Sequence, residues 1–198
     1  MKHTFQKHNR RSLRLKGYDY SQAGVYFITL NCQNRHHLFG EIQNGIMCLN
    51  KFGTIAHENW LETPSIRSNV RLGTFVIMPD HMHGILQILE SKGSKELVGK
   101  FQSPTETIGA IIRGFKGSVT TKIKSATRSW QYRNLPSPDL SKNSKLEIAP
   151  GPTAFINLEQ KNSIWQRNYD DRIIWDNQSL IRVTNYINDN PANWKIKQ

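Results

Sequence analysis

Two apolar segments separated by a proline turn constrain the fold of this chain most strongly. Residues 70–78 (VRLGTFVIM) and 81–89 (HMHGILQIL) are rich in aliphatic and β-branched residues, and Pro79 and Asp80 lie between them. Proline cannot donate a hydrogen bond to a sheet ladder, so we interpret residues 78–80 as a short connection. The two segments are therefore predicted to form an antiparallel hairpin.

Other segments can be placed around this hairpin. Residues 24–32 and 163–175 are predicted as strands or extended segments, and residues 46–62, 107–124 and 176–189 as helices. The order β-α-β-β-α-β-α predicts an α+β fold, a ferredoxin-like or RRM-like four-stranded antiparallel sheet with two helices on one face. The other face is expected to stay open, which suits a site that must admit nucleic acid.

The length of 198 residues suits a single domain, 1–198. We expect a basic N-terminal arm over 1–20 and a flexible insertion over 126–160, where prolines lie among Ser, Asn and Lys without a period. The sequence contains no run of about 20 apolar residues and no secretory signal, which favours a cytoplasmic protein without a membrane span. Cys32 and Cys48 form no CxxC pair and are interpreted as reduced thiols.

The charge balance favours a polyanionic partner. Lys and Arg number 27 against 15 Asp and Glu, giving a formal net charge of +12. Such an excess is typical of nucleic-acid binding, because neutralised phosphates release condensed counterions. The alternative is a basic protein kept soluble by its charge, and charge alone does not distinguish DNA from RNA. Candidate DNA contacts, each of which could equally be a solvated charge, are Arg14, Arg35, Lys116, Arg167 and Arg172.

The motif His81-Met82-His83 is the clearest candidate for chemistry. In a strand, residues i and i+2 point to the same face, so both imidazoles would project together and Met82 would project to the other face. Two neutral imidazoles on an exposed sheet face can bind one metal ion. Histidines that are merely exposed or hydrogen-bonded would explain the motif as well.

The last predicted helix supplies a candidate nucleophile. Its inward stripe, by 3.6-residue spacing, is predicted to be Leu180, Val183, Thr184 and Ile187. Tyr186 lies beside that stripe and Asn190 follows one turn later. A phenol attacks phosphorus poorly at its usual pKa of about 10 unless a divalent ion polarises the phosphate. The alternative is a boundary tyrosine with its hydroxyl at the surface.

Four segments together resemble a known family. They are YDYSQAGVYFITLNCQNRHHLFGEI, VIMPDHMHGIL, IWQRNYDDRII and NYINDNPANW. The resemblance itself covers nearly the whole chain except 126–160. The combination is similar to the REP-associated tyrosine transposases of the HUH single-strand transposase superfamily. The resemblance implies the HUH endonuclease fold, single-stranded or hairpin DNA as partner, and Mg²⁺ or Mn²⁺ as cofactor.

The resemblance also implies residue roles. His81 and His83 match the metal-binding pair, Tyr186 matches the tyrosine that forms a 5′-phosphotyrosine link, and Asn190 matches a residue that completes the metal site. Relatives often carry an acidic residue followed by histidine where this chain has Asp171 and Arg172, so no histidine ligand is expected there.

Three readings of the function stay open at this point. The favoured one is a DNA nicking and strand-transfer enzyme acting near hairpins as a monomer or homodimer. A catalytically inert RRM-like nucleic-acid-binding module is the alternative, and a nuclease that uses water as its nucleophile is a third. Asp80 is a candidate for orienting a ligand histidine, and Trp165 is expected in the core, with base stacking as the alternative.

Overall fold

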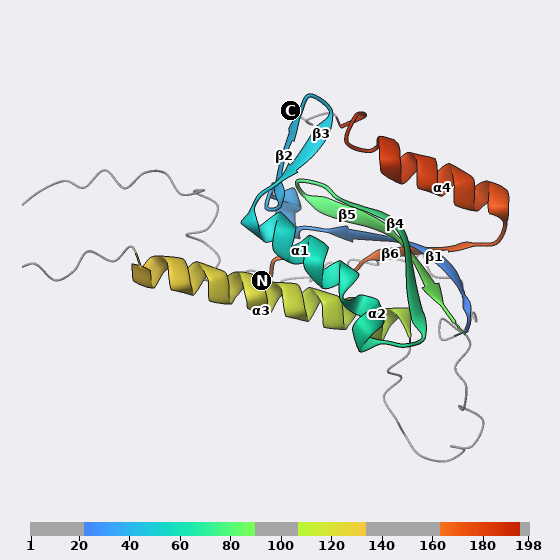
Figure 1. Cartoon of the computed structure of the whole chain (residues 1–198), viewed down its shortest axis with the longest axis horizontal. Coiled ribbons are helices and arrows are strands. Elements are labelled where there is room, and N and C mark those ends of the chain that lie inside the picture. The colour runs from blue at the N-terminus through green and yellow to red at the C-terminus, as the bar shows by residue number, and fades with distance from the viewer. Residues whose placement is uncertain (1–21, 90–106, 134–162, 195–198) are drawn as a thin grey trace, which may run out of the picture.

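The computed structural model describes residues 22–89, 107–133 and 163–194 (Figure 1). Arg14, the basic arm and most of the predicted insertion therefore lie outside the described residues. The elements, in chain order, are β1 (Gly24–Asn31), η1 (Gln33–Arg35), β2 (Gly40–Gln43), β3 (Ile46–Leu49), α1 (Lys51–Leu61), α2 (Thr63–Ile66), β4 (Val70–Ile77), β5 (His81–Ile88), α3 (Ile108–Arg133), β6 (Asp170–Ile174) and α4 (Asn177–Asp189).

The main sheet has the strand order β4-β5-β1-β6, and all its neighbouring strands are antiparallel. This confirms the predicted ferredoxin-like α+β fold. Figure 1 shows α1 and α3 on one side of the sheet and α4 on the other. The face that the sequence predicts to be open is therefore covered by α4, which contacts β4, β5 and β6.

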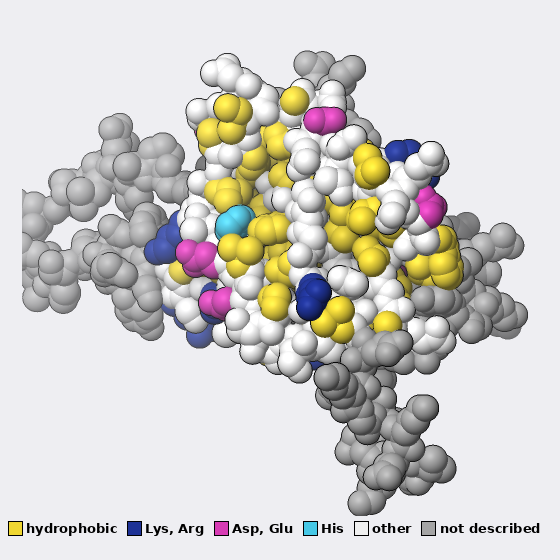
Figure 2. Space-filling model, turned by 45° about the vertical axis from the view of Figure 1, so that its right-hand side comes forward, with side chains coloured by type: hydrophobic (Ala, Val, Ile, Leu, Met, Phe, Trp, Pro, Cys, Tyr) yellow, Lys and Arg dark blue, Asp and Glu magenta, His cyan; other side chains and the backbone are white. Residues whose placement is uncertain are grey.

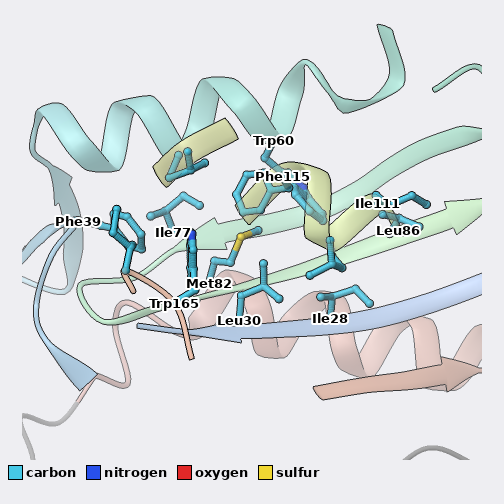
Figure 3. Close-up of a cluster of buried hydrophobic side chains, with 14 of the residues drawn as sticks. Ile28, Leu30, Phe39, Trp60, Ile77, Met82, Leu86, Ile111, Phe115 and Trp165 are labelled. Carbon is cyan, nitrogen blue, oxygen red and sulfur yellow. The ribbon is translucent and has the colours of Figure 1, made fainter. Parts of the chain in front are cut away.

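The core lies between the sheet and the α1–α3 pair. Side chains of β1 alternate between this core and the α4 face, so Tyr26, Ile28 and Leu30 are fully buried. The helices contribute Trp60 and Phe115, whose rings meet edge-on with centroids 5.1 Å apart. Trp165 is also buried, which confirms its predicted place in the core (Figure 3).

The predicted helix over residues 46–62 is wrong in its first part. Residues Ile46–Leu49 form strand β3, which pairs with β2 in a separate two-stranded sheet, and the helix begins at Lys51. Asn44 and Gly45 form the turn between the strands with positive φ angles of 51° and 76°. An Asn-Gly pair is the typical sequence of such a hairpin turn. Asn50 then caps α1 by accepting hydrogen bonds from the amides of Phe52 and Gly53.

Two other predicted boundaries need correction. Helix α3 continues to Arg133, so residues 126–133, predicted as part of a flexible insertion, are helical. Residues 125–133 contain no proline or glycine to end the helix, and the first proline comes at 136. The extended segment predicted over 163–175 forms a ladder only at Asp170–Ile174, preceded by an isolated bridge between Trp165 and Cys32. Both cysteines are free, as predicted, and no helix of the described residues could cross a membrane.

Two helical glycines make a matched pair for testing the packing. A Cβ added at Gly53 in α1 would lie 2.1 Å from the main-chain oxygen of Phe39, whereas one at Gly117 in α3 would meet nothing within 4 Å. Replacing an exposed helical glycine by alanine usually stabilises a protein by about 1 kcal/mol. We therefore expect Gly117→Ala to raise the free energy of unfolding by roughly that amount.

We expect Gly53→Ala to lower the free energy of unfolding by about 1–3 kcal/mol, because the backbone must move to relieve the overlap. Urea denaturation of both variants measures the difference. Equal stabilisation by the two substitutions would contradict the close approach of α1 to the Phe39 carbonyl.

Candidate active site

The two histidines of the motif lie on the α4 face of strand β5. His81 pairs in register with Asn31 of β1, and His83 pairs with Thr29. Met82, between them, is fully buried on the core face. The strand period of two therefore brings the imidazoles together as predicted, and their Nε2 atoms are 3.1 Å apart. The prediction that the pair would be exposed is wrong, because only 5% of His81 and 6% of His83 is accessible.

His83 contacts two side chains of the neighbouring strand β1. Its Nδ1 lies 2.9 Å from Thr29 Oγ1, and its ring stacks on Phe27 with centroids 5.3 Å apart. Burial lowers the pKa of His83 to about 3, and the electrostatic interactions with His81 and Arg35 act in the same direction. The ring is therefore neutral at physiological pH, which is the form that can bind a metal ion.

His81 is held by a carboxylate. Its Nδ1 lies 2.5 Å from Oδ1 of Asp80, and Oδ2 of Asp80 accepts from Arg35 Nε at 2.8 Å. Burial raises the pKa of Asp80, but the hydrogen bond from His81 and the electrostatic interactions with His81, Arg35 and His37 outweigh it and hold that pKa below its usual value. Asp80 is thus an ionised, buried acceptor beside the imidazole.

Helix α4 brings the candidate nucleophile to this pair. Asp176 caps the helix by accepting a hydrogen bond from the Ser179 amide at 2.7 Å. The inward stripe is as predicted, since Ile187 is fully buried and the other three residues, Leu180, Val183 and Thr184, are half-buried.

Tyr186 spans the space between α4 and the sheet. Its hydroxyl lies 3.2 Å from His83 Nε2, and its ring meets the edge of Phe27 with centroids 6.0 Å apart. Half of the tyrosine remains exposed to solvent. The structure therefore joins His81, His83 and Tyr186 in one cluster, although the tyrosine and His83 are 103 residues apart.

Asn190 lies at the end of this helix. It is the C-cap of α4, and its amide donates to the carbonyl of Ile187. Within the described residues its side chain makes no hydrogen bond to either histidine. Its predicted role as a metal ligand stays a prediction.

Sequence reasoning assigned no role to Trp194, Phe27 or Thr29. The Trp194 ring stacks on His81 with centroids 5.6 Å apart and meets the edge of His37 at 5.8 Å. The available signal for Phe27 and Thr29 was the strand alternation of β1, which places them opposite the buried Tyr26, Ile28 and Leu30. Trp194 follows the end of α4, where periodicity carries no information.

The predicted DNA contacts have different surroundings. Arg167 and Arg172 are exposed, and Arg172 pairs in register with Phe27, so it projects on the α4 face. Arg35 is half-exposed and engaged with Asp80 and Asn31. Lys116 Nζ donates to the main-chain oxygens of Gln166 at 2.9 Å and Asn168 at 3.0 Å. Their contacts with DNA stay predictions.

The burial of Lys116 makes the free energy of unfolding depend on pH. Burial lowers the pKa of Lys116 to about 8, whereas an unfolded lysine titrates near 10.4. Between these values the unfolded chain binds more protons, so the free energy of unfolding contributed by this group rises with pH across that window and is lowest below it.

We expect wild type to gain stability relative to Lys116→Met between about pH 8 and about pH 10. Urea denaturation of both chains at several pH values measures this difference. A difference that stays constant across the window would show that Lys116 titrates normally.

The histidine pair fits a metal ion through its ring geometry. Each Nδ1 is engaged by a polar partner, Asp80 or Thr29, while the two Nε2 atoms face each other. Ligand histidines typically present one nitrogen to the metal and donate the other to such a partner. The described residues contain no group of three or more His, Cys, Asp or Glu side chains that could hold an ion. The protein would therefore supply two imidazole ligands there, and water or a substrate phosphate could complete the coordination.

Comparisons with known proteins agree with this architecture. An uncharacterized protein of Haemophilus influenzae (strain Rd) is 36% identical over 199 residues, covering 96% of this chain and 93% of the relative. The solved structure of a REP-associated tyrosine transposase bound to a REP hairpin superposes with a TM-score of 0.52 at 16% identity. That match covers 92% of this chain and 73% of the other. No family model matches the sequence.

Proposed function

Because this chain belongs to the same family as the Haemophilus influenzae protein and has the fold of a REP-associated tyrosine transposase, we propose that it is a transposase that cuts and rejoins single-stranded DNA near hairpins. The observation that carries the proposal is the position of the Tyr186 hydroxyl, 3.2 Å from a buried histidine of the HMH pair. A boundary tyrosine with its hydroxyl turned to solvent would not contact this pair.

The reaction is a transesterification at phosphorus. The Tyr186 oxygen loses its proton and bonds to the phosphorus, the bond from phosphorus to the 3′ oxygen breaks, and that oxygen takes up a proton. The products are a 5′-phosphotyrosine and a free 3′-OH, and the retained ester energy allows the reverse step onto a new 3′-OH.

The proposed cofactor is Mn²⁺ or Mg²⁺, held by His81 and His83, with Asn190 as a third candidate ligand. When bound, the ion would supply Lewis-acid polarisation of the scissile phosphate. The neutral imidazole of His83 supports this assignment, because protonated histidine cannot bind a cation. Imidazole donors favour a transition metal, which makes Mn²⁺ the better fit of the two.

The surface around Tyr186 supports a single strand as substrate. Large apolar side chains are exposed on α4 and just before it, namely Trp175 at 70%, Ile181 at 59% and Tyr186 at 50%. Figure 2 shows apolar side chains reaching the surface among few charged ones on one side of the molecule. Exposed aromatic rings can stack on unpaired bases, whereas bases within a duplex are already stacked.

Trapping of a covalent adduct tests the proposal. Hairpin-bearing single strands, labelled at either the 5′ or the 3′ end, are incubated with the full chain in Mn²⁺, Mg²⁺ or EDTA and run on a denaturing gel. We expect the 3′ label to move with the protein and the 5′ label to appear as a free shorter strand, in metal but not in EDTA. A nuclease using water would release both fragments, and an inert binding module would cut neither strand.

A further inference from the structure

We propose that Asp80 and Arg35 are a pair of positioning residues that fix His81 in the tautomer with its proton on Nδ1. The inference rests on the proposed function only for the identity of the metal ion that His81 would bind. Neither residue would touch the DNA phosphate for this role.

The carboxylate determines which nitrogen of His81 carries the proton. Asp80 is only 4% exposed, and its Oδ1 lies 2.5 Å from His81 Nδ1. A carboxylate that forms an ion pair with a guanidinium, as Asp80 does with Arg35, can only accept hydrogen bonds, so Nδ1 must be the donor. The unprotonated Nε2 is then the atom that faces His83, 3.1 Å away.

Arg35 fixes the carboxylate in turn. Its Nε donates to Oδ2 of Asp80 at 2.8 Å, and its Nη1 donates to Asn31 Oδ1 in the neighbouring strand. Each oxygen of Asp80 therefore has its own donor, so the carboxylate cannot rotate without losing one of them. Arg35 reaches this position with a φ of 55°, directly after Asn34 with a φ of 53°. Such a left-handed backbone is uncommon for a residue other than glycine.

The main chain around Asp80 is also held by this loop. The Cys32 amide donates to the Asp80 carbonyl at 2.8 Å, and the amides of Leu38 and Phe39 donate to the Pro79 carbonyl. The turn that carries Asp80 is thus bound on both sides by the segment that carries Arg35.

The other histidine lacks such a constraint. The partner of His83 Nδ1 is the Thr29 hydroxyl, which can either donate or accept. The two histidines are therefore not equivalent. His81 is fixed as an Nε2 ligand by its carboxylate partner, whereas the Thr29 hydroxyl is compatible with either tautomer of His83. Thr29→Val is consequently a matched control, because it removes the polar partner of the other ring.

Tautomers of the full chain can be measured by long-range ¹H–¹⁵N correlation spectra with ¹⁵N-labelled histidine, with the His81 signals assigned from His81→Gln. We expect His81 to be protonated at Nδ1 in wild type and in Thr29→Val. In Asp80→Ala we expect the proton to move to Nε2. Asp80→Asn keeps the side-chain shape with one acceptor oxygen for two donors, and it should give a mixture. The same His81 tautomer in wild type and both Asp80 variants would overturn the proposal.

Metal affinity and chemical rescue test the role of Arg35. We expect Asp80→Ala to weaken Mn²⁺ binding by about 10–100-fold, measured by the spin-resonance signal of free Mn²⁺. Arg35→Ala should weaken it less and recover with millimolar ethylguanidinium, whereas Glu62→Gln, a carboxylate paired with Lys122, should leave it unchanged. Unchanged affinity in both Asp80→Ala and Arg35→Ala would overturn the positioning role. A wild-type chain with the expected tautomers that forms no DNA adduct would contradict the proposed function and leave the pair supported.

Discussion

Replacing Tyr186 by phenylalanine should abolish formation of the covalent DNA adduct while leaving hairpin binding intact. The substitution removes only the hydroxyl, which lies 3.2 Å from His83 Nε2. The ring can keep its edge contacts with Phe27 and His83, so helix α4 should stay docked. Loss of a covalent nucleophile typically lowers a rate by about 10³-fold or more. Single-turnover cleavage of an end-labelled strand measures the rate, and a mobility shift measures binding.

Tyr169→Phe is the matched control for this experiment. Tyr169 also lies near the C-terminal part of the chain, but it packs against the hydrophobic core, and Lys116 Nζ lies 5.7 Å from its ring centroid. That core is on the opposite side of the sheet from α4. We expect Tyr169→Phe to form the adduct at the wild-type rate. An adduct that survives in Tyr186→Phe and disappears in Tyr169→Phe would contradict the assignment of the nucleophile.

Local pattern accounts for the parts of the site that depend on one element at a time. The alternation of strand β5 places His81 and His83 together, and the spacing of α4 places Tyr186 beside the buried Ile187. The cap at Asp176 is likewise a local feature, because aspartate is a preferred residue directly before a helix. Each of these follows from the period of a single strand or helix.

The remaining parts depend on contacts between segments. The Asp80–Arg35 bridge requires two consecutive left-handed residues after β1. Asparagine is one of the residues that adopt this conformation more often, but nothing local predicts it for Arg35. The burial of the histidine pair depends on the docking of α4 and on Trp194 stacking over His81. The β2–β3 hairpin is different, because the Asn44-Gly45 turn is a local signal that outweighs the helical spacing of Ile46 and Leu49.

The second large effect is expected from removing either histidine of the pair. We expect His81→Ala and His83→Ala to reduce cleavage by about 10³-fold or more, because the phosphate would lose its polarising ion. EDTA should do the same to wild type, and added Mn²⁺ should restore wild type only.

Both histidines are buried, so the variants must be separated from simple unfolding. Each removes a packed ring, which is expected to lower the free energy of unfolding by about 1–3 kcal/mol, and circular dichroism with urea denaturation gives the fraction that stays folded. His57→Ala is the matched control, since His57 also packs its ring against an aromatic residue, Phe75, with centroids 5.1 Å apart, but it lies on α1. We expect this variant to lose comparable stability and keep its cleavage rate. Cleavage that persists in EDTA, or that falls equally in His57→Ala, would show that the histidine pair stabilises the fold without binding a catalytic metal. The variants on the two sides of the sheet lose similar packing, so only the loss of a metal ligand would make their cleavage rates differ.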